Sequence, residues 1–345
     1  MRIAVIGAGS LGSYYGGILT RAGEDVTFVA RGATLATLRA KGLTVTLGGE
    51  SASFTVPVRA TDEADALGIM DCVLFCVKAY DTADAAVQIP PLIGPETVVI
   101  PVQNGIDSAE RIAAITGAAN VVGGVALINA TVVSPGVVSV SGGARTTLIF
   151  GELADGQSAR TDRLETVFQA AGVAAQADPG IRTALWSKFL MICAFGGVSA
   201  LTRLPYGVIV ADAATRMLIQ RAAGEVIACA RAQQVALPED CIERWFELFA
   251  DNPAFASAYS SQYHDLVAGR RLEVPYLNGA LVRLGRNSVS PHPSTSRSPP
   301  RSRHMRRASR SRPISPESVG HPRTTPSDRR HRARPGSRHR FDARG

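Results

Sequence analysis

The chain has 345 residues, is 46% hydrophobic and carries a formal net charge of +8. Its charge is uneven, because residues 287–345 hold fifteen arginines, no lysine and three acidic residues, which leaves a net charge of −4 on the first 286 residues. The body of the chain is therefore not a basic nucleic-acid-binding domain, and it is long enough for two domains with proper cores. No uninterrupted apolar run reaches the ~18 residues that a membrane-spanning helix needs.

The first predicted elements are a strand and a helix joined by a glycine-rich loop. The apolar run of residues 3–6 leads into the loop Gly7, Ala8, Gly9, Ser10, Leu11, Gly12. In a GxGxxG loop the first glycine permits a tight turn, the second lets the backbone approach a pyrophosphate, and the third lets the helix pack closely on the strand. Unpaired N–H groups at the helix N-terminus then bind the phosphates. The alternative interpretation is an ordinary tight turn, since glycine is frequent in this chain.

The second predicted strand, residues 25–30, indicates which cofactor the loop binds. Domains that bind NAD place an acidic residue about 20 residues after the glycine loop, where it contacts the ribose 2′-hydroxyl. Here Arg31 follows the strand, and its planar set of donors suits a 2′-phosphate. Asp25 opens the strand and is expected at the wrong end. The sequence thus favours NADP over NAD, with a solvated loop charge at Arg31 as the alternative.

Further strands are predicted near residues 72–77 and 97–102, with alanine-rich stretches between several of them. This alternation predicts an α/β fold with a Rossmann-type, doubly wound parallel sheet. Residues 121–150 are predicted to add strands that extend or edge this sheet. After Asp178, Pro179 and Gly180 the pattern becomes helical. We therefore expect an NADP-binding domain over 1–178 and an all-helical substrate and catalytic domain over 181–286.

Two polar residues follow predicted strands of the sheet. Lys78 comes after one strand, and Asn104 comes after the next. Ligands of open parallel sheets bind outside the carboxyl ends of the strands, so both side chains are expected to contact cofactor or substrate. For Asn104 an ordinary Asn-Gly turn is an equally weighted interpretation.

Lys188 is a candidate proton donor at the start of the helical domain. The chain has three lysines, Lys41, Lys78 and Lys188, in an otherwise arginine-rich composition. Lys188 lies among apolar residues, and burial favours its neutral form and lowers its pKa. A lysine tuned in this way suits proton donation near neutral pH. A lysine that snorkels at a helix edge is the alternative.

A third segment contains Ser260, Ser261 and, further on, Glu273 followed by the pair Asn278 and Gly279. If Glu273 faces Lys188 across a cleft, its carboxylate can hold the ammonium charged and oriented. Sequence separation alone does not establish that contact.

These segments, in this order, resemble the ketopantoate reductase (2-dehydropantoate 2-reductase) family over residues 1–286. The resemblance implies reduction of the ketone of 2-dehydropantoate to pantoate by NADPH, a step of pantothenate and coenzyme A biosynthesis. It implies that residues 7–12 and Arg31 bind the cofactor, and that Lys78 and Asn104 line the nicotinamide and substrate cleft. It also implies that Lys188 donates the proton, that Ser261 binds the substrate and that Glu273 lies beside the lysine.

Two departures from the family bear on the substrate. The best-known members carry asparagines where this chain has Ile192 and Ala258. Buried polar partners are what a site uses to reject analogues, so the reaction type is better supported than the substrate. A reductase of another 2-keto acid is one alternative. A non-catalytic dinucleotide sensor, or a nucleic-acid-binding protein that uses its basic end, is another.

Residues 287–345 differ from everything before them. They are rich in Arg, Ser and Pro, lack leucine and hold five of the six histidines. Such a composition cannot bury enough apolar surface to fold, which predicts a disordered tail. The abrupt change within a helical domain is typical of an out-of-frame C-terminus and predicts that the domain lacks its last helix. A natural basic tail for nucleic acid or acidic surfaces is the alternative.

The cysteines bear on compartment and metal binding. Their spacing does not suggest a zinc site, and the sequence predicts no metal. Their odd number, without a signal peptide, predicts reduced thiols in a cytoplasmic protein. The expected partner is a small 2-keto acid rather than a membrane or nucleic acid. The sequence leaves the oligomeric state open, with a homodimer as one option.

Overall fold

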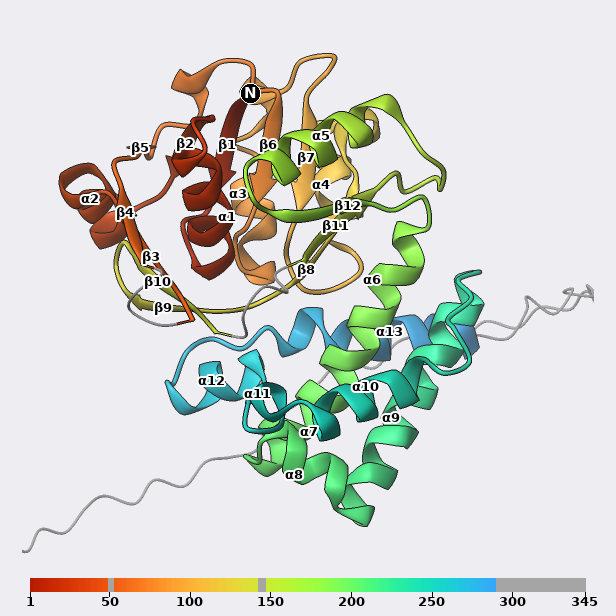
Figure 1. The fold of residues 1–345 in the computed structure, drawn as a ribbon. Helices are drawn as coiled ribbons and strands as arrows, with labels where there is room; N and C mark the ends of the chain where they lie inside the picture. The colour runs from red at the N-terminus through yellow and green to blue at the C-terminus, as the bar shows by residue number, and fades with distance from the viewer. Residues whose placement is uncertain (49–52, 142–146, 290–345) are drawn as a thin grey trace, which may run out of the picture. The chain divides into compact units, whose positions relative to one another are not determined.

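The computed structural model describes residues 1–48, 53–141 and 147–289, all within the compact unit Met1–His292. Most of the predicted tail, residues 290–345, lies outside the described residues. Figure 1 shows the order of the elements along the chain.

The first sheet is parallel and five-stranded, with the order β5-β2-β1-β6-β7. Its strands are β1 (Arg2–Ile6), β2 (Asp25–Val29), β5 (Arg59–Thr61), β6 (Cys72–Phe75) and β7 (Val98–Pro101). This confirms the four predicted strands and adds a short fifth one. Between the strands lie α1 (Ser10–Arg21), α2 (Gly32–Lys41), α3 (Thr82–Ala86), η2 (Asp65–Leu67), η3 (Ala79–Asp81) and η4 (Pro90–Leu92), and α4 (Ser108–Thr116) follows β7.

Both faces of this sheet are buried, and alternate residues of each strand serve the two faces. Ile3 and Val5 of β1 belong to the same core as Leu19 of α1. Ala4 and Ile6 belong to a second core, which includes Ile112 of α4. Because successive strand side chains point to opposite faces, a nearly continuous apolar strand requires helices on both sides. The doubly wound arrangement follows from this pattern.

Residues 121–151 correct one detail of the prediction, because they form two further sheets instead of extending the parallel one. One sheet has the order β4-β3-β10-β9, and the other has the order β12-β11-β8. The strands are β3 (Leu43–Leu47), β4 (Phe54–Val56), β8 (Gly123–Leu127), β9 (Asn129–Ser134), β10 (Val137–Ser141), β11 (Thr147–Gly151) and β12 (Ala174–Ala177). The physical reason is the turn at residues 134–136, which pairs β9 with β10 antiparallel, while β10 takes β3 as its other neighbour. A single bridge, from Val99 to Val121, links this region to the parallel sheet.

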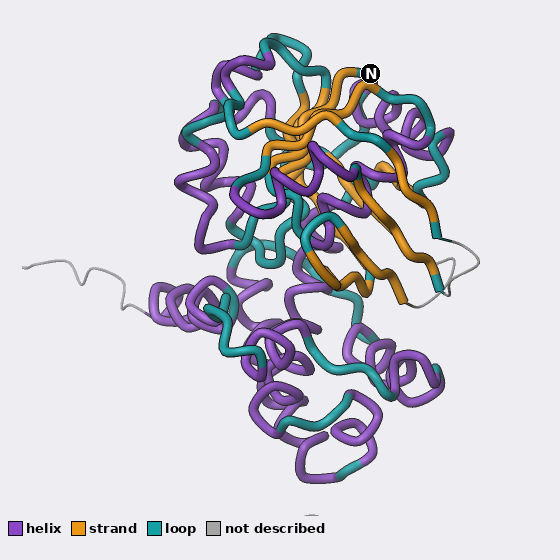
Figure 2. The backbone as a smooth tube through the Cα atoms, turned by 90° about the vertical axis from the view of Figure 1, so that its left-hand side faces the viewer, coloured by secondary structure: helices purple, strands orange, loops and turns teal. Residues whose placement is uncertain are grey.

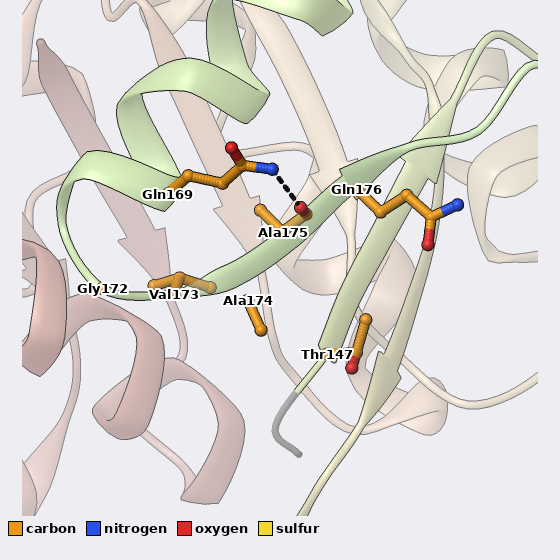
Figure 3. Close-up of a pocket in the computed structure, with 7 residues that line it drawn as sticks. All are labelled: Thr147, Gln169, Gly172, Val173, Ala174, Ala175 and Gln176. Atoms are coloured by element: carbon orange, nitrogen blue, oxygen red, sulfur yellow. Dashed lines mark hydrogen bonds between the residues drawn. The ribbon is translucent and has the colours of Figure 1, made fainter. Parts of the chain in front are cut away.

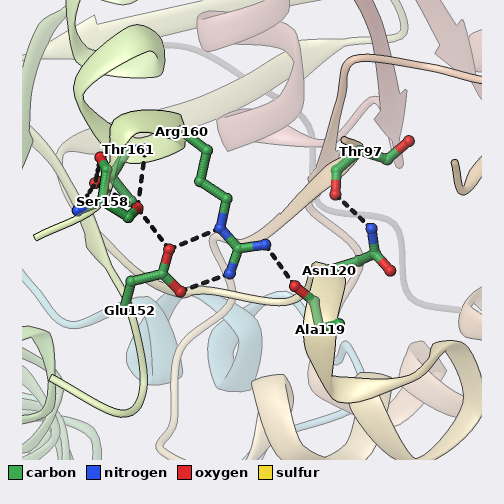
Figure 4. A network of polar contacts seen from close by, with 7 residues as sticks. All are labelled: Thr97, Ala119, Asn120, Glu152, Ser158, Arg160 and Thr161. Carbon is green, nitrogen blue, oxygen red and sulfur yellow. Dashed lines mark hydrogen bonds and ion pairs between the residues drawn. The ribbon is translucent and has the colours of Figure 1, made fainter. Parts of the chain in front are cut away.

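A polar network fixes the turn into α5 (Ala159–Ala170) against the parallel sheet (Figure 4). Ser158 caps this helix, since its side chain accepts from the backbone N–H of Thr161. Arg160 forms a two-pronged ion pair with Glu152 and donates to the carbonyl of Ala119, in η5 (Ala118–Asn120). Planar guanidinium-carboxylate pairs of this kind fix orientation as well as distance. The loop between β11 and α5 is therefore held firmly.

The chain becomes helical at Ile181, as predicted, and stays so to Val289 (Figure 2). The helices are α6 (Ile181–Leu190), the π-helix η6 (Met191–Gly196), α7 (Gly197–Thr202), α8 (Tyr206–Ala211), α9 (Ala213–Ala232), α10 (Cys241–Asp251), α11 (Pro253–Ala256), α12 (Ser261–Val267), η7 (Val274–Tyr276) and α13 (Asn278–Val289). Their core is aromatic: Phe195 packs against Phe246, and Tyr206 stacks on Phe249 with ring centroids 4.1 Å apart.

The run Ile181–Thr202 is long and apolar enough to cross a membrane by length and composition alone. Of its most apolar 18-residue stretch 61% is buried inside the protein, which is typical of a core helix. Its π-helical middle leaves two carbonyl groups that side chains satisfy: Gln262 donates to the Ile192 oxygen (3.2 Å), and Asn278 donates to the Cys193 oxygen (3.0 Å). Such π-bulges often occur at functional sites, and this one begins three residues after Lys188.

Candidate active site

The glycine loop has the geometry that the sequence predicts. Gly7 has a φ of +97°, and a Cβ there would lie 2.8 Å from a methyl group of Val77. A Cβ on Gly12 would lie 2.1 Å from the carbonyl oxygen of Gly7. Both positions therefore require glycine, the first for the turn and for packing, the second for close approach of α1 to β1.

Gly9 differs from the other two glycines, because a Cβ there would meet nothing within 4 Å. It is the N-cap of α1, which has no side-chain cap and no acidic residue in its first turn. The N–H groups of this turn are thus open to an anion, and the helix dipole favours negative charge there. Ala8, Ser10 and Leu11 are half-buried beside it. These features fit a dinucleotide pyrophosphate.

Arg31 lies just past the carboxyl end of β2, as expected for a residue near the ribose. It is exposed and forms the N-cap of α2 in extended conformation. Within the described part of the chain its guanidinium has no ion-pair or hydrogen-bond partner, so it is available to a ligand. Asp25 opens β2 at the opposite end, where it pairs with Arg59. The placement fits a 2′-phosphate at Arg31.

Lys188 lies on α6 against β8. Its ammonium Nζ donates to the carbonyl oxygen of Ala126, 2.7 Å away. Burial lowers the pKa of Lys188 to about 8, and the negative charge of Glu273 partly opposes this shift. A lysine in this range can hold a proton at neutral pH and still release it readily.

Glu273 has a different direct partner from the one considered from the sequence. Its carboxylate accepts from the backbone N–H of Ala79 (2.9 Å) and from Lys78 Nζ (2.9 Å). It acts on Lys188 through its charge, without a hydrogen bond between them. The site therefore contains two lysines that share the influence of one buried carboxylate.

Lys78, at the end of β6, also donates to Asp265 Oδ2 at 2.8 Å. Burial alone would lower the pKa of Lys78, but the Glu273 and Asp265 carboxylates outweigh it and hold that pKa above its ordinary value. Asp265 in turn accepts from Arg270 Nε at 2.8 Å. The sequence analysis singled out neither Asp265 nor Arg270. The only signal was that Asp265 follows Ser261 by one helical turn.

Asn104 and Ser261 present polar groups that the described residues leave unpaired. Asn104 is half-buried in the loop after β7, where a Cβ on Gly105 would lie 3.7 Å from the Tyr276 oxygen. Ser261 is exposed at the start of α12. Its neighbour Ser260 is buried and caps that helix, because its hydroxyl accepts from the Tyr263 N–H at 3.1 Å. The two serines therefore have different roles, and only Ser261 is available to a ligand.

Ile192 and Ala258 are apolar members of the helical region. Ile192 lies one turn beyond Lys188 and is 7% exposed within the helical core. Ala258 packs at the edge of the same core, and its carbonyl accepts from the Tyr206 N–H at 2.9 Å. Neither side chain can hydrogen-bond a substrate hydroxyl.

A separate pocket lies at the edge of α5, β11 and β12 (Figure 3). Its wall is formed by Thr147, Gln169 and residues 172–176. The Gln169 amide already donates to the Ala175 carbonyl at 2.9 Å. None of the candidate site residues lines this pocket, and it lacks a titratable side chain. We therefore place the candidate active site at the strand ends and not here.

Two family patterns match the chain: "Ketopantoate reductase PanE/ApbA" over residues 3–155, and "Ketopantoate reductase PanE/ApbA C terminal" over residues 180–296. The 2-dehydropantoate 2-reductase of Halobacterium salinarum is 32% identical over 291 residues, which cover 83% of this chain and 93% of that protein. The enzyme of the same name from Mesorhizobium japonicum is 31% identical over 315 residues, covering 85% and 94%.

The fold comparison gives the same result. The crystal structure of 2-dehydropantoate 2-reductase from Geobacter metallireducens matches with a TM-score of 0.77 and 30% identity. The match covers 84% of this chain and 94% of that one. With both family patterns in order along one chain, and with relatives above 30% identity over most of its length, the chain belongs to the ketopantoate reductase family.

Proposed function

We propose that the chain catalyses the NADPH-dependent reduction of 2-dehydropantoate to pantoate. The observation that carries this proposal is Lys188: an ammonium whose pKa burial lowers to about 8, held at β8 within the influence of a buried carboxylate. Such a group is suited to giving a proton to a carbonyl oxygen. Relatives that bear the name 2-dehydropantoate 2-reductase support the substrate.

The cofactor would be held by the backbone of residues 7–12 and by Arg31. The open space at Gly9 and the uncapped α1 N-terminus suit the pyrophosphate, and the exposed guanidinium of Arg31 suits a 2′-phosphate. NADPH, when bound, supplies the hydride that reduces the ketone carbon. Lys78 and Asn104, at the carboxyl ends of neighbouring strands, would line the reacting end of the cofactor.

In the reaction, Lys188 would donate one proton to the ketone oxygen, so that the ketone gains a hydride and a proton and becomes an alcohol. Asn104 and Ser261 would bind and orient the keto acid through their unpaired polar groups. Glu273, anchored on the Ala79 N–H, would keep Lys188 charged until the proton is needed. Lys78 would remain a permanent positive charge in the cleft, because two carboxylates hold it.

A second candidate, the reduction of another 2-keto acid, is favoured by one observation. Ile192 and Ala258 are apolar members of the helical core at two positions where the best-known members of the family carry asparagines. An apolar wall accepts a hydroxyl-bearing substrate and its hydroxyl-free analogue with little discrimination. The reaction type and the proton donor are the same in both candidates.

We also propose that the protein acts in the cytoplasm. The five cysteines of the described structure are free thiols, and four of them are buried. Free, buried thiols are typical of proteins from reducing compartments.

The test measures NADPH oxidation, through the loss of NADPH absorbance, with 2-dehydropantoate and with a panel of other 2-keto acids. We expect turnover with at least one of them, loss of turnover in Lys188→Ala, and full turnover in the control Lys41→Ala, since Lys41 is exposed at the end of α2. A chain that binds NADPH but oxidises it with no keto acid would be a dinucleotide sensor, and the proposal would be wrong.

A further inference from the structure

Four charged side chains form a row from the exposed Arg270 to the buried carboxylate of Glu273. Arg270 Nε donates to Asp265 Oδ1 at 2.8 Å, Lys78 Nζ donates to Asp265 Oδ2 at 2.8 Å, and the same ammonium donates to Glu273 Oε2 at 2.9 Å. Cations and anions alternate along the row, and its total charge is zero. The two carboxylates are buried, whereas Lys78 and Arg270 are 42% and 57% exposed.

The row has two anions around one lysine. Glu273 would suffice to neutralise Lys78, yet Asp265 approaches the same ammonium just as closely, at 2.8 Å against 2.9 Å. Burying the second carboxylate is costly unless it is paired, and Arg270 supplies that pairing. Burial alone would raise the pKa of Asp265, but hydrogen bonds from Lys78 and Arg270 hold it below its ordinary value. A charged, buried Asp265 therefore needs an explanation other than neutralising Lys78.

We propose that Asp265, paired with Arg270, is a positioning residue: it shares the Lys78 ammonium with Glu273 and so keeps the Glu273 carboxylate effective on Lys188. If Asp265 were neutral, the positive charge of Lys78 would fall on Glu273 alone. The net field of the row at Lys188 would then become more positive. Asp265 contacts neither Lys188 nor, by this proposal, the substrate, and it acts through its neighbours.

The surroundings of Lys188 contain few other charges that could act in this way. Its helix α6 packs against β8, β11, η6 and α9. Strands β8 and β11 carry no titratable side chain, and η6 carries Cys193, whose thiol burial keeps neutral by raising its pKa. The charged side chains of α9, which are Arg216, Arg221, Glu225 and Arg231, are all exposed. On α6 itself, Arg182 donates to the carbonyl of Gln233. Glu273 is the one charge that is seen to raise the pKa of Lys188 within the described residues, and the row reaches Lys188 through it.

The proposal predicts shifts of opposite sign for two variants. Asp265→Asn removes a negative charge from the row and should lower the pKa of Lys188. Arg270→Gln removes a positive charge and should raise it, by less, because Arg270 is exposed and water screens it. For Asp265→Asn we expect a shift of roughly half a pH unit, because the lost unit charge acts on Lys188 from a distance, through protein and water.

The measurement uses the lysine content of the chain. Lysine labelled with ¹³C at the ε position gives three signals, from Lys41, Lys78 and Lys188, and their shifts report each ammonium directly as the pH is varied. The Lys188 signal is assigned by its loss in Lys188→Arg. Lys41, exposed and remote from the row, is the internal reference. The full-length chain is used throughout, and each variant is first checked by thermal unfolding.

Opposite shifts of the Lys188 midpoint in Asp265→Asn and Arg270→Gln support the proposal, together with a smaller shift in Asp265→Glu, which keeps the charge. An unmoved Lys188 midpoint in a folded Asp265→Asn protein, or shifts of the same sign in both variants, would overturn it. The role in turnover rests on the proposed function, but the titration does not require activity. Inactivity toward every keto acid would therefore end the proposed function and leave this inference to be decided by the titration.

Discussion

The two sides of the candidate site are built from different parts of the chain: one mainly from backbone, the other from charged side chains. The nucleotide side consists of backbone, with a loop in which Gly7 and Gly12 remove side chains so that α1 can approach β1. The reacting side consists of charged side chains, in which Lys78 meets Asp265 and Glu273, 187 and 195 residues further along the chain. The first side has no room for a Cβ at Gly7 or Gly12, and the second side depends on its charges.

Because of this difference, substitutions on the two sides are expected to impair different properties of the protein. Changes on the nucleotide side should act on stability and on cofactor binding, because they alter shape or a phosphate contact. Changes on the reacting side should act on rate and on pH dependence, because they alter proton transfer.

The largest effect is expected at the proton donor. Lys188→Ala should lower kcat roughly 10²- to 10⁴-fold, as loss of a general acid usually does. The Kd of NADPH should stay near that of the wild type, because Lys188 contacts β8 and not the glycine loop. Stopped-flow turnover and fluorescence titration measure the two quantities. A variant that keeps most of its turnover would show that Lys188 is only a helix-edge lysine.

The turnover rate should depend on pH through the titration of Lys188. Lys188 must be protonated to act as an acid, and burial lowers its pKa to about 8. The rate should therefore be constant below that value and fall about tenfold for each further pH unit above it. Initial rates with saturating NADPH between pH 6 and 10 test this. A profile that is flat through pH 9 would contradict the assignment.

The contrast between the two sides also explains how much the sequence predicted. The glycine loop, the strand and helix on either side of it and the change to helix at Ile181 depend on neighbouring residues, so local patterns were sufficient. Lys78, Lys188 and Glu273 were recognised as candidates, but which lysine pairs directly with Glu273 depends on how α12 and η7 pack on the strand ends. No local pattern encodes that packing.

Asp265 is the clearest example of what sequence analysis misses. It lies in a polar stretch beside exposed residues, and nothing in its neighbours indicates that it is buried. The strands β3, β4 and β12 were also missed: β4 has only three residues, and β3 and β12 pair with β10 and β11, which are distant in sequence.

The next prediction concerns cofactor choice on the nucleotide side. Arg31→Ala should weaken NADPH binding by about 1.5 to 3 kcal/mol, the usual contribution of a hydrogen bond to a charged group, and hardly affect NADH. The turnover rate at saturating cofactor should be unchanged. Binding titrations with both cofactors measure this. Equal losses for NADPH and NADH would mean that Arg31 does not contact the 2′-phosphate.

The glycines allow a matched pair of variants in the same loop. Gly12→Ala should destabilise the fold by about 1 to 3 kcal/mol, since its Cβ would lie 2.1 Å from the Gly7 oxygen and the backbone must shift. Gly9→Ala should fold normally, because its Cβ points into open space, but it should weaken NADPH binding. Thermal unfolding and NADPH titration separate the two effects. Similar behaviour of both variants would contradict distinct roles for these glycines.

The smallest effect is expected in substrate discrimination, and a substitution at Ile192 tests it. The substrates to compare are 2-dehydropantoate and 3,3-dimethyl-2-oxobutanoate, which differ only by one hydroxyl group. The wild type should discriminate between them by less than about a hundredfold, as an apolar wall does. Ile192→Asn should favour the hydroxyl-bearing acid further, by about two- to tenfold, the contribution of one neutral hydrogen bond.

Because Ile192 is buried, the variant will lose stability, but the ratio of the two kcat/KM values is independent of the folded fraction. Ile192→Leu, which conserves volume, is the control and should leave the ratio unchanged. Equal ratios in both variants would place Ile192 outside the substrate's reach and remove the argument that this position sets the substrate range.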